Sequence, residues 1–363
     1  MASATNSSSM RMKNEKIILS LINREPISRA DIAKKTGLTK AAVTIIVEDL
    51  LKRGIVTEER AEDFAGVGRT PILLRLCGNS TYFVGVNIRR SSIIVGICDL
   101  LGNVISEDSL EMEKPETAIR GICSVIAEKI QMCDIPKEKI HKISVTTPGP
   151  VDIVSGCILN PPNFNPWHGI NIKNEMAKYT DIPVILSNVS SAVAASEKYF
   201  GAARDSENFM TLLTDDGIGA GIFVGGKLFK GSCEIGHISV KYDGERCECG
   251  NIGCLEKYAS IPNILKGTGY KSWNECINAR DMGIMTLEAE YLSAAIVTAT
   301  NIFDLDCTIL CGALSEASDE FLPVVSEKTL EKMILKKDFK VLSGAVCSQT
   351  LIPCAMGLYD FLN

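Results

Sequence analysis

Four potential metal ligands lie within a short stretch of the sequence, residues 234–256, and constrain its fold more than any other feature. They supply one nitrogen and three sulfur donors: His237, Cys247, Cys249 and Cys254. This donor set matches a tetrahedral Zn²⁺ site, and four protein ligands leave no open position for an activated water. Gly250 and Gly253 let the chain turn tightly around one ion. We therefore expect a structural zinc, in preference to a chance cluster in a cysteine-rich chain.

The composition is that of an ordinary soluble protein. The chain has 363 residues, of which 46% are hydrophobic and 23% charged, enough for two or three domains with cores. No apolar run approaches the ~20 residues that cross a bilayer, and the run at 17–22 is too short for a signal peptide. Fourteen cysteines without an export signal indicate a reducing compartment. We expect a cytoplasmic protein with no membrane partner.

The first 60 residues differ in charge from the rest of the chain. Residues 11–60 carry 11 Lys and Arg against 7 Asp and Glu, although the whole chain has a net charge of −6. Apolar spacing predicts helices at 14–24, 29–35 and 40–53, with Ser28 and Thr39 as N-caps. Two short helices joined by a glycine turn are typical of a helix-turn-helix, whose second helix enters the DNA major groove. The alternative is a small helical subdomain with a solvated basic face.

A wing is predicted after these helices, from β-rich runs at 55–59 and 66–76. The start of the third helix and the wing tip are the segments best placed to contact double-stranded operator DNA. Helix residues would meet base edges or phosphates, and Arg69 would reach the minor groove. The predicted DNA-contacting residues are Thr39, Lys40, Ala41, Ala42, Thr44 and Arg69.

From Tyr82 onwards, β-rich runs alternate with helical stretches, which predicts an α/β chain. We expect strands at 82–88, 92–98, 140–146, 184–186, 209–213 and 220–223, and helices at 115–133 and 171–178.

Several motifs together resemble those of the ROK family of repressors, open reading frames and sugar kinases. They are Gly-Arg-Thr-Pro at 68–71, Pro-Gly-Pro-Val-Asp at 148–152, Glu-Ile-Gly-His at 234–237 and Cys-Glu-Cys-Gly-Asn-Ile-Gly-Cys-Leu-Glu at 247–256. The resemblance implies a winged helix-turn-helix at residues 1–76, followed at 77–363 by a two-lobed actin-like (ribonuclease-H-like) fold around a cleft. Lobe 1 would take residues 77–190 and the C-terminal end, and lobe 2 residues 191–340.

The resemblance also implies a sugar site. In the family, the zinc loop holds Glu and His side chains against the sugar, and two further loops contribute to the site. The residues carried over are Gly149, Asn163, Asn188, Glu234, His237 and Glu256. Trp167 would wall an apolar sugar face.

The positions that resemble the kinases' phosphate-transfer machinery are altered. Residues 87–91 read Asn-Ile-Arg-Arg-Ser where the kinases have Asp-x-Gly-Gly-Thr, and Asp215-Asp216 occupies the second phosphate loop. Val189 stands where the kinases carry the aspartate that acts as general base, and it cannot accept a proton. We therefore predict a non-enzymatic, sugar-responsive repressor that forms a homodimer or a higher homo-oligomer. Two alternatives are an ATP-dependent sugar kinase retaining a DNA-binding arm, and a DNA-binding protein controlled by another protein without a small-molecule effector.

Overall fold

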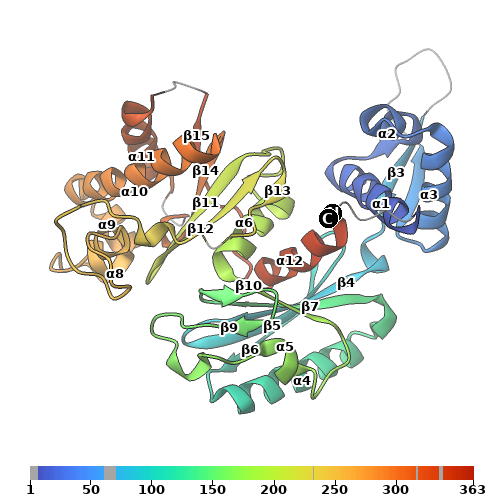
Figure 1. Ribbon diagram of the computed structural model, residues 1–363, viewed down its shortest axis with the longest axis horizontal. Coiled ribbons are helices and arrows are strands. Elements are labelled where there is room, and N and C mark those ends of the chain that lie inside the picture. The colour runs from blue at the N-terminus through green and yellow to red at the C-terminus, as the bar shows by residue number, and fades with distance from the viewer. Residues whose placement is uncertain (1–6, 61–70, 232, 316–317, 335–337) are drawn as a thin grey trace, which may run out of the picture. The chain divides into compact units, whose positions relative to one another are not determined.

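The N-terminal part of the chain, residues 7–60 and 71–76, forms the head, a bundle of three helices that packs on a small sheet. The computed structural model describes residues 7–60, 71–231, 233–315, 318–334 and 338–363. The three helices are α1 (Ser7–Arg24), α2 (Arg29–Thr36) and α3 (Lys40–Lys52), and the antiparallel sheet has the order β1 (Ile27–Ser28), β3 (Ile72–Leu76), β2 (Val56–Arg60) (Figure 1).

Local sequence signals explain where the two central helices of the head begin and end. Ser28 Oγ accepts a hydrogen bond from the backbone N–H of Asp31 at 3.2 Å, and Thr39 Oγ1 accepts one from that of Ala42 at 3.2 Å. Both predicted N-caps are therefore confirmed. Gly37 ends α2 with a φ of 71°, a backbone conformation that glycine adopts without strain. The α2–turn–α3 unit is a helix-turn-helix in its geometry.

Two features of the head differ from the sequence prediction, and one predicted contact is not tested. Helix α1 begins at Ser7, a turn or more before the predicted start at residue 14. Strand β1 was not predicted, because two residues are too few to show an alternating pattern. The wing tip with Arg69 lies outside the described residues, so the placement of that predicted contact stays open.

The first large sheet has five strands in the order β10-β7-β4-β5-β6. Helices α4 and α5 cover one face and α12 the other (Figure 1). Its core consists mainly of Val and Ile side chains from the central strands and α4. The elements are β4 (Tyr82–Ile88), β5 (Ser92–Asp99), β6 (Val104–Glu111), α4 (Pro115–Met132), β7 (Ile140–Thr147), α5 (Ile172–Met176), β10 (Val184–Asn188) and α12 (Leu351–Leu362), with the short strands β8 (Val151–Asp152) and β9 (Cys157–Ile158).

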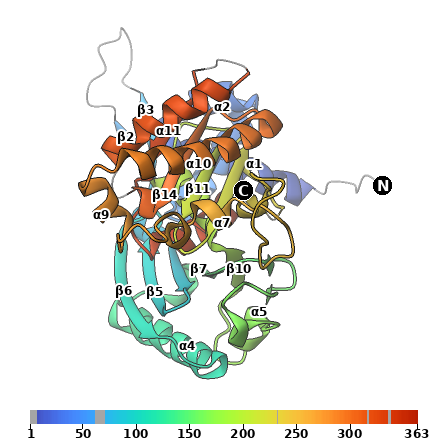
Figure 2. The same cartoon turned by 90° about the vertical axis from the view of Figure 1, so that its left-hand side faces the viewer.

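The second large sheet also has five strands, in the order β13-β12-β11-β14-β15. Helix α6 packs on β11 and β12, and α10 and α11 pack together over the opposite face (Figures 1 and 2). The elements are α6 (Val189–Phe200), β11 (Phe209–Thr214), β12 (Ile218–Val224), β13 (Lys227–Leu228), α7 (Glu256–Ala259), α8 (Ile261–Ile264), α9 (Trp273–Asn278), α10 (Met282–Phe303), β14 (Cys307–Gly312), α11 (Ser318–Lys332) and β15 (Lys340–Ser343).

The strands and helices predicted from residue 82 onwards are present, with ends that shift by up to two residues. Helices α6 to α12 were not predicted. No helix in the described ranges combines the length and apolarity needed to cross a bilayer.

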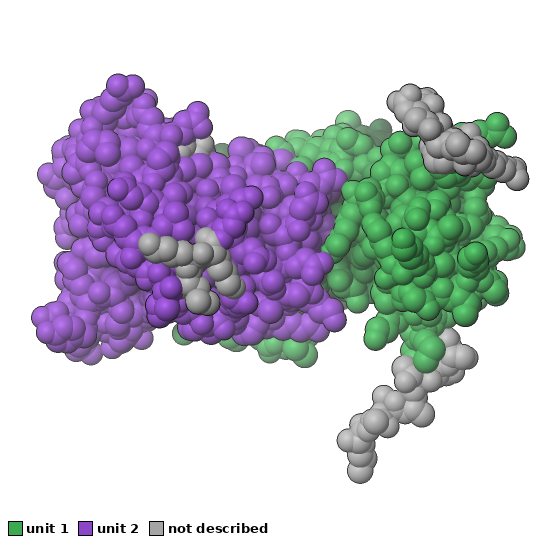
Figure 3. Space-filling model, turned by 90° about the horizontal axis from the view of Figure 1, so that it is seen from above, with its two compact units in different colours: residues 1–187, 349–363 green, residues 188–348 purple. Residues whose placement is uncertain are grey.

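The chain divides into two compact units, coloured separately in Figure 3. Unit 1 comprises Met1–Ser187 and Gln349–Asn363, and unit 2 comprises Asn188–Ser348. Unit 1 thus holds the head together with the first large sheet. The narrower division into a head at 1–76 and lobes at 77–190 and 191–340 stays a prediction.

Helix α12 joins the head to the first large sheet inside unit 1. Lys16 Nζ of α1 donates to the backbone oxygen of Asp360 at 2.8 Å, and Ser20 Oγ donates to that of Leu362 at 3.2 Å. The Asp360 carboxylate lies 2.9 Å from His141 Nε2 and 2.5 Å from Lys142 Nζ, both on β7. These hydrogen bonds lower the pKa of Asp360 below its usual range. One helix therefore contacts both the sheet and the head.

Candidate functional site

The four predicted zinc ligands converge in unit 2. One ligand atom from each of His237, Cys247, Cys249 and Cys254 lies within 4.8 Å of all the others. Cys247 Sγ is 3.7 Å from His237 Nδ1, and Cys249 Sγ is 3.6 Å from Cys254 Sγ. Tetrahedral Zn–S and Zn–N bonds of about 2.3 and 2.0 Å place ligand atoms roughly 3.5–3.8 Å apart, so the cluster fits one zinc ion.

Backbone hydrogen bonds hold the loop in this shape. The N–H of Cys247 donates to the oxygen of Asn251 at 2.9 Å, and the N–H of Gly250 donates to that of Cys247 at 3.0 Å. Gly253 has a φ of 69°, and a Cβ there would lie 1.6 Å from the backbone oxygen of Lys241. Only glycine fits at this position. The tight turn expected at Gly250 and Gly253 is therefore present.

The thiols of the cluster differ in their acidity. Backbone hydrogen bonding, chiefly by Asn251, lowers the pKa of Cys249, whereas burial raises the pKa of Cys254 to about 12. A zinc ion binds thiolates and so compensates for the burial of negative charge. The donor chemistry and the geometry both suit a closed, structural site.

Four of the predicted sugar-contacting residues lie in unit 2, near or within the zinc loop or at the start of α6. Glu234 is exposed and directly precedes the short 3₁₀ helix Ile235–His237. His237 turns Nδ1 towards the sulfur atoms, which leaves Nε2 for a second partner. Asn188 is the N-cap of α6, and its Oδ1 accepts from the N–H of Ser191 at 3.0 Å.

Glu256 connects the zinc loop to the neighbouring turn. It is the first residue of α7, and its Oε2 accepts a hydrogen bond from the N–H of Ile218 at 2.9 Å. A Cβ at Gly217 would lie 2.6 Å from the same oxygen. Glu256 therefore has a structural role at this turn through Oε2.

Gly149 and Asn163 lie in unit 1. Gly149 precedes Pro150 through a cis peptide bond, and Asn163 is exposed with a φ of 55°. Trp167 is 1% exposed and stacks on Phe164, with ring centroids 5.6 Å apart, inside the core of the first large sheet. The expectation that Trp167 walls a sugar face is wrong in this structure, because its ring is already covered. The six predicted sugar contacts thus fall into two groups. Gly149 and Asn163 belong to unit 1, and the other four residues belong to unit 2.

Asn87 and Asp215, at two of the altered phosphate-transfer positions, have hydrogen-bond partners within the protein. Asn87 is 2% exposed, and its Nδ2 donates to Gln349 Oε1 at 2.8 Å while its Oδ1 accepts from Thr146 Oγ1 at 3.0 Å. Asp215 Oδ1 accepts from the N–H of Ala313 at 3.0 Å. Val189 begins α6 with an apolar side chain. The hydrogen bonds of Asn87 and Asp215 hold loops of the protein together.

The start of α3 presents most of the predicted DNA-contacting residues to solvent. Lys40 and Ala41 are exposed, and Ala42 and Thr44 are half-buried. The Thr39 hydroxyl is engaged as the N-cap, and Thr44 Oγ1 donates to the backbone oxygen of Lys40 at 2.9 Å. The structure places these residues together on one helix, with Thr39 at its cap.

Ile45 on α3 was absent from the predicted contacts although it is 59% exposed. It lies off the buried stripe of this helix, formed by Val43, Ile46, Val47 and Leu50. The sequence contained a signal for this exposure, because Ile45 is an apolar residue outside the helical spacing of the buried stripe.

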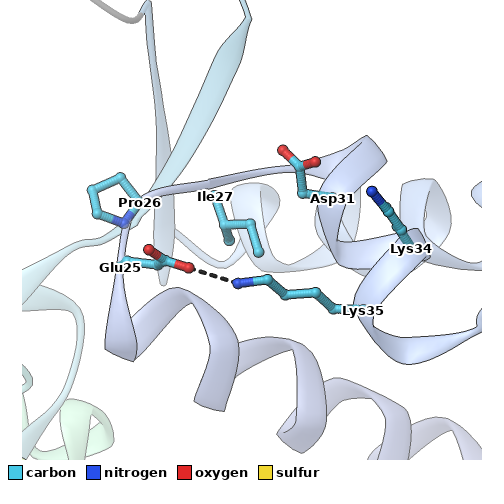
Figure 4. A pocket seen from close by; sticks show the side chains of 6 residues that line it. All are labelled: Glu25, Pro26, Ile27, Asp31, Lys34 and Lys35. Carbon is cyan, nitrogen blue, oxygen red and sulfur yellow. Dashed lines mark hydrogen bonds and ion pairs between the residues drawn. The ribbon is translucent and has the colours of Figure 1, made fainter. Parts of the chain in front are cut away.

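A pocket on the surface of the head lies between the end of α1 and α2 (Figure 4). Its lining residues are Glu25, Pro26, Ile27, Asp31, Lys34 and Lys35. Lys35 Nζ and Glu25 Oε1 are 2.6 Å apart, as the dashed line shows. Two acidic and two basic side chains balance each other, so the lining carries no net charge to attract an anion.

Comparison with known proteins gives consistent results over nearly the whole chain. The ROK family model matches residues 83–347 and the MarR family model residues 13–63. The chain is 29% identical to the xylose repressor of Bacillus subtilis (strain 168), covering 95% of this chain and 91% of that one. It is 30% identical to the DNA-binding transcriptional dual regulator NagC of Escherichia coli (strain K12), covering 86% and 82%. The solved structure of a ROK family transcriptional regulator, a homolog of the E. coli MLC protein, has a TM-score of 0.81 and 25% identity, covering 97% of this chain and 98% of that one.

Proposed function

The chain belongs to the ROK family, and on that premise we propose that it is a sugar-responsive transcriptional repressor. Its head binds operator DNA through the helix-turn-helix, and the remainder of the chain binds a sugar or sugar derivative. The named relatives, a xylose repressor and the regulator NagC, support this function. A homodimer or higher homo-oligomer matches the two-fold symmetry of operators that such heads bind.

The observation that carries the proposal is the geometry of α2, the turn and α3. Both helices are capped by their own side chains, and α3 turns Lys40 and Ala41 towards solvent while its opposite face is buried. The head also has a surplus of four positive charges over residues 11–60. Positive charge attracts the phosphate backbone, and the exposed helix face reads base edges.

The positions altered from the kinase pattern support binding without phosphoryl transfer. Asn87 and Asp215 form hydrogen bonds that stabilise the fold, and Val189 has no group that accepts a proton. Loss of a positioned general base costs roughly 10²–10⁴ in rate. The ROK family also contains sugar kinases, so this part of the proposal is tested directly by assaying ADP release.

The test of DNA binding uses the full-length protein and duplexes selected from a random-sequence library. We expect affinity to fall steeply with salt, as phosphate contacts require. Lys40→Gln, at the start of α3, should weaken binding and flatten the salt dependence, whereas Lys52→Gln, at the far end of the same helix, should change both less. Selection of no duplex at low salt would refute the function of the head.

The test of sugar sensing is a calorimetric screen of common monosaccharides and their phosphates. We expect one of them to bind and to change DNA affinity, because an effector must bind the two states differently. Glu256→Gln removes the charge but can still accept from Ile218, so it should weaken sugar binding and spare DNA binding without sugar. Turnover near ~10 s⁻¹ in the ADP assay would show a kinase instead. Binding of no sugar would favour control by a protein partner.

A further inference from the structure

The outward face of α3 has an apolar centre. Its exposed residues recur at helical spacing, with Ala41, Ile45 and Glu48 one turn apart. Ile45 is 59% exposed, whereas its neighbours Ile46 and Val47 are 4% and 0% exposed. Ile45 is thus the large apolar side chain that this helix presents to solvent.

The hydroxyl groups near this face are already engaged. Thr39 Oγ1 accepts from the N–H of Ala42 at 3.2 Å, and Thr44 Oγ1 donates to the backbone oxygen of Lys40 at 2.9 Å. With the Thr44 hydroxyl turned to the helix backbone, its methyl group is the part that remains for other contacts. The middle of the face therefore offers methyl groups from Ala41, Thr44 and Ile45, and not free hydroxyls.

Isoleucine at position 45 contributes little to the stability of the head itself. With more than half its surface exposed, the side chain gains only part of the free energy of apolar burial. Its β-branch also makes it a poorer helix former than alanine by a few tenths of a kcal/mol. Most of this side chain is therefore available for contact with another molecule.

In the major groove, thymine carries the 5-methyl group, an apolar contact on the base edge. We propose that Ile45 reads a thymine by packing against this methyl group in each half-site, with the methyl groups of Ala41 and Thr44 beside it. This inference rests on the proposed function, because it requires α3 to enter the major groove. It identifies a specificity-determining residue and the base that it selects.

The experiment replaces thymine by deoxyuridine in the selected duplex, one position at a time. This change removes the 5-methyl group and keeps the base pair. For the full-length wild-type protein, we expect each half-site to contain one thymine whose replacement raises Kd roughly fourfold. This is the change that corresponds to the loss of one buried methyl contact. For Ile45→Ala, the same replacement should leave Kd unchanged.

Two further variants separate the contact from its alternatives. Ile45→Val keeps the branched methyl groups and should keep the dependence on thymine. Met12→Ala removes an apolar side chain from α1 that is also 59% exposed. This variant should keep the dependence on thymine as well. Wild-type binding that is indifferent to every replacement, or Ile45→Ala binding that keeps the dependence, would overturn the inference. Failure to select any duplex would instead overturn the proposed function.

Discussion

A fully buried carboxyl group should make the stability of unit 2 fall as the pH rises. Glu288 on α10 is 0% exposed and lies among buried residues such as Met285, Ala289 and Leu292. Neither of its carboxyl oxygens has a hydrogen-bond partner within the described residues. Burial therefore raises the pKa of Glu288 well above its usual value of 4.5, and the folded protein keeps this side chain protonated.

The sign and size of the effect follow from proton linkage. Below about pH 4.5 both the folded and the unfolded chain hold the proton, so Glu288 adds no pH dependence. Above that pH the unfolded chain releases the proton and the folded chain retains it. The free energy of unfolding should then fall by about 1.4 kcal/mol for each pH unit until the raised, folded pKa is reached.

Urea denaturation at several pH values between 5 and 8 measures this slope. The two tryptophans lie in different units, Trp167 in unit 1 and Trp273 in unit 2, so Trp273 fluorescence in a Trp167→Phe background reports on unit 2. In Glu288→Gln, the free energy of unfolding should fall less steeply with pH than in the wild type, by about 1.4 kcal/mol per pH unit. Glu288→Leu should do the same and also raise stability, because it leaves no unpaired polar group.

The matched control is Glu290→Gln on the same helix. Hydrogen bonds from Lys332 and Lys328 lower the pKa of Glu290, so its contribution to stability is lost only when the pH falls below about 4.5. This variant should keep the wild-type slope between pH 5 and 8. If Glu288→Gln also has the wild-type slope, then Glu288 is ionised in the folded protein and the reasoning is wrong.

Three other predictions concern the metal cluster and α12. Metal analysis should find about one zinc per chain, lost in Cys249→Ser but retained in Cys347→Ser, which changes an exposed cysteine outside the cluster. Gly253→Ala should lower zinc content and melting temperature more than Gly250→Ala, because only at Gly253 would the added Cβ clash with a backbone oxygen; equal effects would contradict this. Asp360→Asn should lower the stability of unit 1 at pH 7 by on the order of 1 kcal/mol, and the difference from wild type should vanish as the pH falls below about 3.8, as Trp167 fluorescence during urea denaturation would show.

Features set by neighbouring residues could be predicted from the sequence. Ser28 and Thr39 cap helices through residues three positions away, and the zinc ligands lie within one loop. The order of strands in each large sheet required the structure, because pairings such as β11 with β14 join residues about a hundred positions apart.

Long-range partners also account for what the sequence did not show at the candidate site. The hydrogen bond from Ile218 to Glu256 spans 38 positions, and that from Asn87 to Gln349 spans 262. Trp167 was assigned to a sugar because the segment 161–167 resembles one in the sugar site of the family, yet Phe164 and the core cover it. Burial of this kind depends on the whole fold and has no local sequence pattern.

The position of α12 has a consequence for the order of folding. This helix covers one face of the first large sheet so closely that a Cβ at Gly85 would lie 2.8 Å from Cys354 Sγ, yet all of unit 2 separates the two in the sequence. A ribosome therefore completes unit 2, a contiguous segment, before it makes the helix that completes unit 1. Domains fold as units during synthesis, so we expect unit 2 to reach its native state first. Until then, the growing chain carries an uncovered apolar sheet face, which is where a chaperone would act.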